Sequence, residues 1–164
     1  MPNKGGGGVL AFIKVNDHQY FEIFNEKDRG EGQLNHIWFY TDNADPMRDY
    51  LTSKGAPAPD KVGRGQTRNK NFNIKDSGGH IVEIVGYQRD SWTAREAGKF
   101  LPSTCISTHI MHVGVLVGDL DKAMAFYQDI LGFKEFWHGS GSSNMLSWVN
   151  MRVPEGEDYL EFML

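Results

Sequence analysis

The chain has 164 residues, of which 40% are hydrophobic and 12% aromatic, so it is long enough to bury the core of one compact domain or of two small units. No apolar run approaches the roughly 20 residues that span a bilayer, and residues 1–8, MPNKGGGG, lack the apolar stretch typical of a secretory signal, so we expect a cytoplasmic protein with no membrane partner. The net charge of −4 is mild and the lysines and arginines are scattered, which argues against a nucleic-acid partner.

The first half of the chain predicts a hairpin, then a strand, a helix and further strands. Residues 1–8 are glycine-rich and predicted to be disordered. The residue pattern predicts strands over residues 9–15 and 19–25, and an aromatic and β-branched run predicts another over residues 34–41. Asp45 and Pro46 form a start signal for a helix over residues 47–54, which Gly55 ends. Residues 56–68 are predicted as loop with at most one weak strand, and residues 71–75 and 80–87 as strands.

The second half repeats this order after a helical or irregular connector, residues 88–108. A strand over residues 111–117 precedes a helix that Asp119 or Asp121 caps and Gly132 ends. Three strands, at residues 133–138, 146–153 and 159–164, complete the unit. We therefore predict an incomplete first unit with its link, residues 9–33, followed by two whole units, residues 34–87 and 109–164.

Three of the predicted strands carry a glutamate at their centre: Glu22, Glu83 and Glu161. Strand alternation places each glutamate on the face opposite its two apolar neighbours. A bare carboxylate in a dry core would cost several kcal/mol, so these faces are solvated, or the carboxylates are paired or bound to a metal. An exposed sheet face is the simplest interpretation for one glutamate, but three at equivalent positions favour a site.

Histidines occupy the first strand of each whole unit, and their spacing to the glutamates nearly coincides. His36 precedes Glu83 by 47 residues, and His112 precedes Glu161 by 49. The lone Cys105 excludes an intrachain disulfide and a cysteine-built zinc site, so imidazole and carboxylate must hold any metal. A single strand histidine is usually a hydrogen-bonded core or surface residue; the matched set of four favours a metal site instead.

The segment HVGVLVGDLDKAMAFYQDILGFKEF (112–136) and the closing strand YLEFM (159–163) resemble a module of the vicinal-oxygen-chelate superfamily, which includes glyoxalases, bleomycin-resistance proteins and extradiol dioxygenases. LNHIWFYTDN (34–43) and KDSGGHIVEIV (75–85) resemble the same landmarks. The resemblance implies an α+β fold whose repeated βαβββ modules form cupped mixed sheets around a divalent metal: Zn, Ni, Co, Mn or Fe(II).

Metal-dependent members of this superfamily take one histidine-type and one glutamate ligand from each module. The resemblance therefore implies His36, Glu83, His112 and Glu161 as metal ligands, with Glu83 and Glu161 as the catalytic carboxylates. The link of 14 residues between Glu22 and His36 is shorter than the 29 between Glu83 and His112. In the alternative arrangement, Glu22, His36 and Glu83 share one cleft, and His112 and Glu161 belong to another. A partner chain or the rest of a longer protein then supplies the missing residues. We expect a homodimer with strand or module exchange.

Three functions fit these features. The first is a divalent-metal-dependent enzyme, isomerase-like or lyase-like, acting on a small substrate with vicinal oxygens. The second is an Fe(II) extradiol-type dioxygenase, which three ligands would favour. The third is a metal-free, antibiotic-sequestering type of dimer that binds a small molecule without reaction. No residue specifies the substrate.

Overall fold

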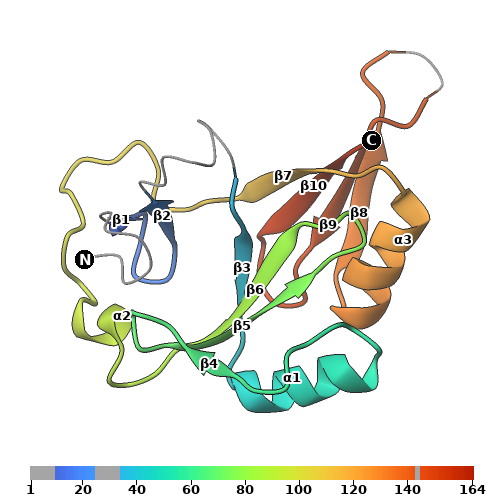
Figure 1. The fold of residues 1–164 in the computed structure, drawn as a ribbon. Coiled ribbons are helices and arrows are strands. Elements are labelled where there is room, and N and C mark those ends of the chain that lie inside the picture. Colours follow the sequence, from blue (N-terminus) through green and yellow to red (C-terminus); the bar gives the residue numbers. More distant parts are fainter. Residues whose placement is uncertain (1–9, 25–33, 143–144) are drawn as a thin grey trace.

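The computed structural model describes residues 10–24, 34–142 and 145–164. Within them the chain forms a two-stranded hairpin and two four-stranded sheets (Figure 1). The predicted fold class, α+β with repeated βαβββ units and cupped mixed sheets, is confirmed. The predicted disordered start, residues 1–8, and residues 25–33 of the predicted link lie outside the described residues. The unit boundaries themselves stay predictions.

The hairpin consists of β1 (Leu10–Lys14) and β2 (Tyr20–Phe24), paired antiparallel with Phe12 opposite Glu22. Asn16 closes the turn, because its side-chain oxygen accepts hydrogen bonds from the backbone N–H groups of His18 and Gln19. This hairpin lies beside the first sheet in Figure 1, although the two sheets include neither of its strands.

The first sheet has the order β3-β6-β5-β4. These strands are Ile37–Tyr40, Ile81–Gly86, Lys70–Lys75 and Gly63–Arg64 respectively. β3 runs parallel to β6, and the other pairs are antiparallel. One face is apolar and faces helix α1 (Ala44–Ser53), and its buried side chains are Phe72, Ile74, Val82 and Ile84. We call the opposite face of each sheet its open face.

Helix α1 begins three residues before the predicted range 47–54, and its N-cap lies two residues before the predicted one. Asn43, not Asp45, is the N-cap, and its side chain accepts a hydrogen bond from the Asp45 backbone N–H. Pro46 still lies within the first turn, where its missing N–H breaks no helical hydrogen bond. The prediction of Asp45 as the cap was therefore wrong, whereas Gly55, at φ +78, does follow the helix end.

The second sheet repeats the first, in the order β7-β10-β9-β8. Its strands are His112–Leu116, Tyr159–Met163, Trp148–Arg152 and Lys134–Gly139 respectively. β7 runs parallel to β10, as β3 does to β6, and the remaining pairs are antiparallel. The connector between the units contains one short helix, α2 (Trp92–Arg95). Equal strand order and equal pairing show that the two halves are structural repeats.

The helix of the second unit changes type along its length. Asp119 caps α3 (Leu120–Met124), which continues directly as a π-helix, η1 (Ala125–Ile130). The wider turn is visible in the hydrogen bond from the Leu131 N–H to the Phe126 carbonyl, five residues back. The sequence pattern predicted a helix here but not the change of type, because periodicity does not reveal the hydrogen-bond offset.

The two units share one core. It joins the apolar faces of both sheets, from Phe72, Ile74, Val82 and Ile84 in the first to Val115, Val149, Met151, Leu160 and Phe162 in the second. The rings of Phe39 and Phe133 meet edge to face with centroids 5.2 Å apart, and the buried Tyr127 hydroxyl donates to Asp76 Oδ2 at 2.9 Å. Each open face lies opposite this core. Within the described residues, no helix is long and apolar enough to cross a membrane.

Candidate functional site

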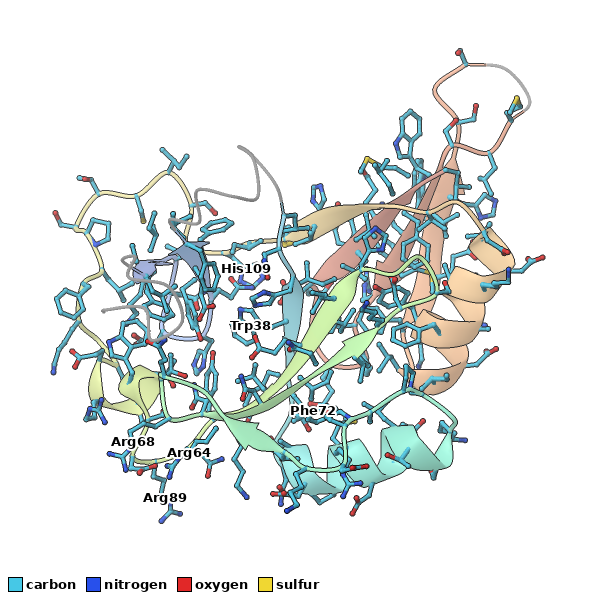
Figure 2. All side chains as sticks on the ribbon, in the orientation of Figure 1. Trp38, Arg64, Arg68, Phe72, Arg89 and His109 are labelled. Atoms are coloured by element: carbon cyan, nitrogen blue, oxygen red, sulfur yellow. The ribbon has the colours of Figure 1, made fainter. Side chains whose placement is uncertain are left out.

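The open face of the first sheet carries the polar residues of the candidate site. Glu83 points away from the core because its neighbours Val82 and Ile84 are buried on the other face. It pairs in register with Trp38 on one side and Asn73 on the other. Figure 2 shows this division, with Trp38 directed toward the hairpin and Phe72 toward α1.

His36 and Glu83 form the centre of the site. His36 Nε2 lies 3.1 Å from Glu83 Oε2, and both side chains are 14% exposed. The other ring nitrogen, Nδ1, lies 2.9 Å from Asn35 Oδ1, so both nitrogens face oxygen atoms. The hydrogen bond with Glu83 raises the pKa of His36; burial opposes the rise, and the charges of Glu83 and Glu22 add to it. This arrangement favours the protonated imidazole when no metal is present.

Asn71 holds the second oxygen of Glu83. Its side-chain amide donates to Glu83 Oε1 from the neighbouring strand β5. The carboxylate is thus fixed from two sides, by His36 and by Asn71. The sequence analysis did not single out Asn71. Its position beside buried Phe72 was the available signal, because alternation places Asn71 on the same face as Glu83.

Glu22 brings the hairpin into the same site. Burial raises the pKa of Glu22 to about 7, the charge of Glu83 adds to the rise, and His36 opposes it. A carboxyl with this pKa changes its charge near neutral pH, unlike an ordinary surface glutamate. The structure therefore brings Glu22, His36 and Glu83 into one electrostatic neighbourhood, as in the second arrangement considered from the sequence.

Aromatic side chains surround these polar groups. Tyr20, which is buried, lies with its ring centroid 5.3 Å from that of Trp38, and the Trp38 ring is 6.0 Å from that of Tyr87. Phe24 of the hairpin meets the His36 ring edge to face at 6.3 Å. The hairpin thereby covers part of the open face of the first sheet, where the His36 and Glu83 side chains are only 14% exposed.

The second predicted pair lies on the open face of the other sheet. The His112 ring is exposed and stacks on Tyr159, with centroids 4.8 Å apart. Glu161 lies in register between Gly114 and Asn150. The structure does not bring this pair to His36 and Glu83, since each open face lies opposite the shared core. The set of four metal ligands stays a prediction that this single chain does not assemble.

The donors at the first site fit a divalent metal in part. Two ligands bound at about 2.1 Å and near right angles lie about 3.0 Å apart, close to the 3.1 Å between His36 Nε2 and Glu83 Oε2. Imidazole and carboxylate are common ligands for transition metals, and Asn71 supplies the outer hydrogen bond that such carboxylates usually have. Within the described residues, no group of three or more His, Cys, Asp or Glu side chains is placed to hold a metal ion. The site thus offers two donors, with Glu22 nearby.

Comparison with known proteins identifies the second unit directly. The family model described as the Glyoxalase/Bleomycin resistance protein/Dioxygenase superfamily matches residues 109–164. The second unit is therefore similar to that superfamily over its whole length. A search of the curated proteins found no match.

Solved structures of a glyoxalase and of dioxygenases share the fold at low sequence identity. A catechol 2,3-dioxygenase aligns with a TM-score of 0.64 and 18% identity, over 94% of this chain and 58% of its own. The 2,3-dioxygenase LapB from Pseudomonas sp. KL28 aligns with a TM-score of 0.61 and 11% identity, over 94% and 61%. The Mn(II)-bound glyoxalase from Novosphingobium aromaticivorans aligns with a TM-score of 0.55 and 16% identity, over 77% and 41%. The chain thus spans about two fifths to three fifths of the length of these three proteins.

Proposed function

We propose that the chain is a divalent-metal-dependent enzyme, isomerase-like or lyase-like, that acts on a small substrate with vicinal oxygens. The observation that carries this proposal is the His36–Glu83 pair, with its donor atoms 3.1 Å apart and a third titratable group, Glu22, beside it. The Mn(II)-bound glyoxalase among the structural neighbours is consistent with a metal of this kind. His36 and Glu83 would hold the ion, and Glu22 is the nearest further candidate.

A divalent ion at this site would polarise the two neighbouring oxygens of a substrate and stabilise negative charge on them. The chain's own residues would provide the proton chemistry. Glu22, whose pKa is about 7, can accept a proton from a substrate C–H or return one near neutral pH. Asn71 keeps Glu83 Oε1 occupied, which leaves Oε2 directed toward His36. The aromatic rings of Tyr20 and Trp38 exclude water from one side.

The side chains around Glu83 favour this proposal over a dioxygenase. An Fe(II) site of the extradiol type uses two histidines and one carboxylate. Around Glu83 the described residues provide one imidazole and two carboxylates, which favours isomerase or lyase chemistry. An Fe(II) dioxygenase stays an alternative if another chain or unit contributes a second imidazole to the site. A metal-free binding protein is the outcome if no ion binds.

Elemental analysis tests this proposal before any substrate is known. Protein purified without added metal, and again after incubation with Mn, Co, Ni, Zn or Fe(II), should retain about one equivalent per His36–Glu83 site. Activity on a hemithioacetal would support the isomerase proposal, whereas oxygen consumption on catechols would support the dioxygenase. Glu22→Gln should lower turnover by about 10²–10⁴ if Glu22 transfers the proton. Failure to retain any metal would contradict the enzymatic proposal.

We further propose that the chain forms a homodimer through the second unit. Its open side exposes Leu116 at 71% and Trp137 at 47%. In the described part of the chain, Asn150 Oδ1 and Arg152 Nε are buried without a hydrogen-bond partner. Both features favour the binding of a second copy of the chain to this face of the sheet. Sedimentation analysis should give twice the 18.5 kDa mass of one chain, and Leu116→Asp should shift it toward monomer. A monomer at all concentrations would contradict the proposal.

A further inference from the structure

Three arginine side chains converge on one aspartate at the edge of the first sheet. Arg64 Nη2 lies 2.5 Å from Asp90 Oδ1, and Arg68 Nη2 lies 2.7 Å from Asp90 Oδ2. Arg95 Nη1 donates to the Asp90 backbone carbonyl at 2.7 Å. Arg89 is exposed next to Asp90 in the chain, and Figure 2 shows Arg64, Arg68 and Arg89 gathered on this side of the molecule. These four arginines are called the arginine cluster.

The arginine cluster carries more positive charge than its aspartate can neutralise. Asp90 contributes one negative charge against the four positive charges of the cluster. The whole chain is acidic, with a net charge of −4, so this patch is opposite in sign to the rest of the surface. Arg64, Arg68 and Asp90 are each about half exposed, so an anion from solution can reach them. Planar guanidinium groups bind phosphate and carboxylate through paired hydrogen bonds.

A buried polar network holds the two loops of the cluster together. Asn69 is 2% exposed; its amide donates to Thr93 Oγ1 at 3.1 Å, and its side-chain oxygen accepts from the Gln88 N–H at 3.1 Å. The Trp92 N–H donates to the Thr67 carbonyl at 2.7 Å. These bonds join the turn before β5 to the segment after β6. The arginines are therefore presented by a rigid base, which reduces the entropy lost on binding a ligand.

Arg68 occupies a backbone conformation that favours glycine. Its φ is +68, which costs roughly 1 kcal/mol or more for a residue with a side chain. The Arg68 carbonyl accepts a hydrogen bond from Arg64 Nε at 2.8 Å, so this strained turn places the two guanidinium groups side by side. Arginine thus stands at a position where glycine would suit the backbone better.

A hollow of about 520 Å³ lies next to the arginine cluster. It is lined by Asp42, Asn43, Lys70, Tyr87, Gln88, Arg89 and Asp90. Its two carboxylates already have donors, Asp90 from the arginines and Asp42 from the Tyr40 hydroxyl. Lys70 also pairs with Asp45, at 2.5 Å. The three carboxylates of Asp42, Asp45 and Asp90 thus face four cationic side chains, Lys70, Arg64, Arg68 and Arg89, which leaves one positive charge in excess. The volume suits a small molecule more than a long polymer.

We propose that the arginine cluster and its hollow bind a small polyanion that carries phosphate or carboxylate groups. Arg64, Arg68 and Arg89 contact the anionic groups, and Asn43 and Gln88 offer further polar contacts from the lining. This inference does not depend on the metal chemistry proposed for His36 and Glu83, so the two can fail separately.

Calorimetric titration of the whole chain with sodium pyrophosphate, and separately with citrate, tests this site. Sodium chloride at equal ionic strength controls for screening. Arg68→Gly relieves the positive φ while removing one charge, so its melting temperature should stay close to that of the parent while Kd rises about tenfold or more. Arg89→Gln should give a similar loss. Tighter binding of pyrophosphate indicates a phosphate ligand, and tighter binding of citrate a carboxylate ligand.

Phe100→Gly provides a matched control. Phe100 is the other non-glycine residue with a positive φ, +59, among the described residues, and it carries no charge. This substitution should leave Kd unchanged. The proposal is overturned if the parent shows no saturable binding beyond the sodium chloride control. It is also overturned if Arg68→Gly binds as tightly as the parent, or if Phe100→Gly weakens binding equally.

Discussion

Glu22 makes the stability of the fold depend on pH in a direction opposite to that of most carboxyl groups. Burial and the charge of Glu83 raise its pKa from the ordinary 4.5 to about 7. The folded state therefore binds this proton more tightly than the unfolded state. The stabilisation is fully present below pH 4.5 and is lost as the pH rises through about 7. The pKa of His36 is also raised, so its contribution is likewise lost as the pH rises.

Substitution of Glu22 by glutamine isolates this effect, because glutamine has the shape of the protonated carboxyl group and cannot ionise. A rise of the pKa from 4.5 to about 7 corresponds to about 3 kcal/mol in the free energy of unfolding. At pH 4, Glu22→Gln and the parent should be about equally stable. At pH 8, the variant should be more stable by up to about that amount.

Urea unfolding at both pH values, in the presence of EDTA, measures this difference. Glu155→Gln changes an exposed carboxyl in a loop and should stay within about 0.5 kcal/mol of the parent at both pH values. A Glu22→Gln variant that is less stable than the parent at pH 8 would refute the reasoning. A difference that is the same at pH 4 and pH 8 would refute it as well.

Two further substitutions test the packing and the helix start. Tyr127→Phe removes the buried hydroxyl that donates to Asp76 across the two units, and should lower the free energy of unfolding by about 1–3 kcal/mol. A loss below about 0.5 kcal/mol would show that this hydrogen bond does not hold the two units together. Asn43→Ala should cost about 1 kcal/mol in thermal unfolding because it removes the cap of α1, and a larger loss from Asp45→Ala would favour the cap first predicted from the sequence.

The repeat and the order of its elements along the chain could be predicted because local patterns specify them. Alternation around Glu83 and Glu161 fixes which face each carboxylate occupies, and Gly55 and Gly132 mark the ends of the helices. The same alternation around Phe72 could also have identified Asn71 as a neighbour of Glu83. Helix details were less accessible, since the Asn43 cap and the π-helix depend on single hydrogen bonds that leave no periodic signal.

The relation between the units could not be predicted from their sequences. It depends on contacts between residues far apart in the chain, such as Phe39 with Phe133 and Asp76 with Tyr127. The spacing of His36 and Glu83 is within two residues of that of His112 and Glu161 whether the open faces meet or point apart. The unequal links on either side of the first whole unit were the sequence feature that favoured grouping Glu22 with His36 and Glu83.

Titration of the metal-free chain with Mn²⁺, compared across single substitutions, tests most directly whether His36 and Glu83 form the metal site. Glu83→Gln and His36→Ala should each abolish binding or weaken it at least tenfold, whereas Glu161→Gln, the equivalent change in the other unit, should leave the affinity at this site unchanged. Full stoichiometry and unchanged affinity in Glu83→Gln would contradict the account.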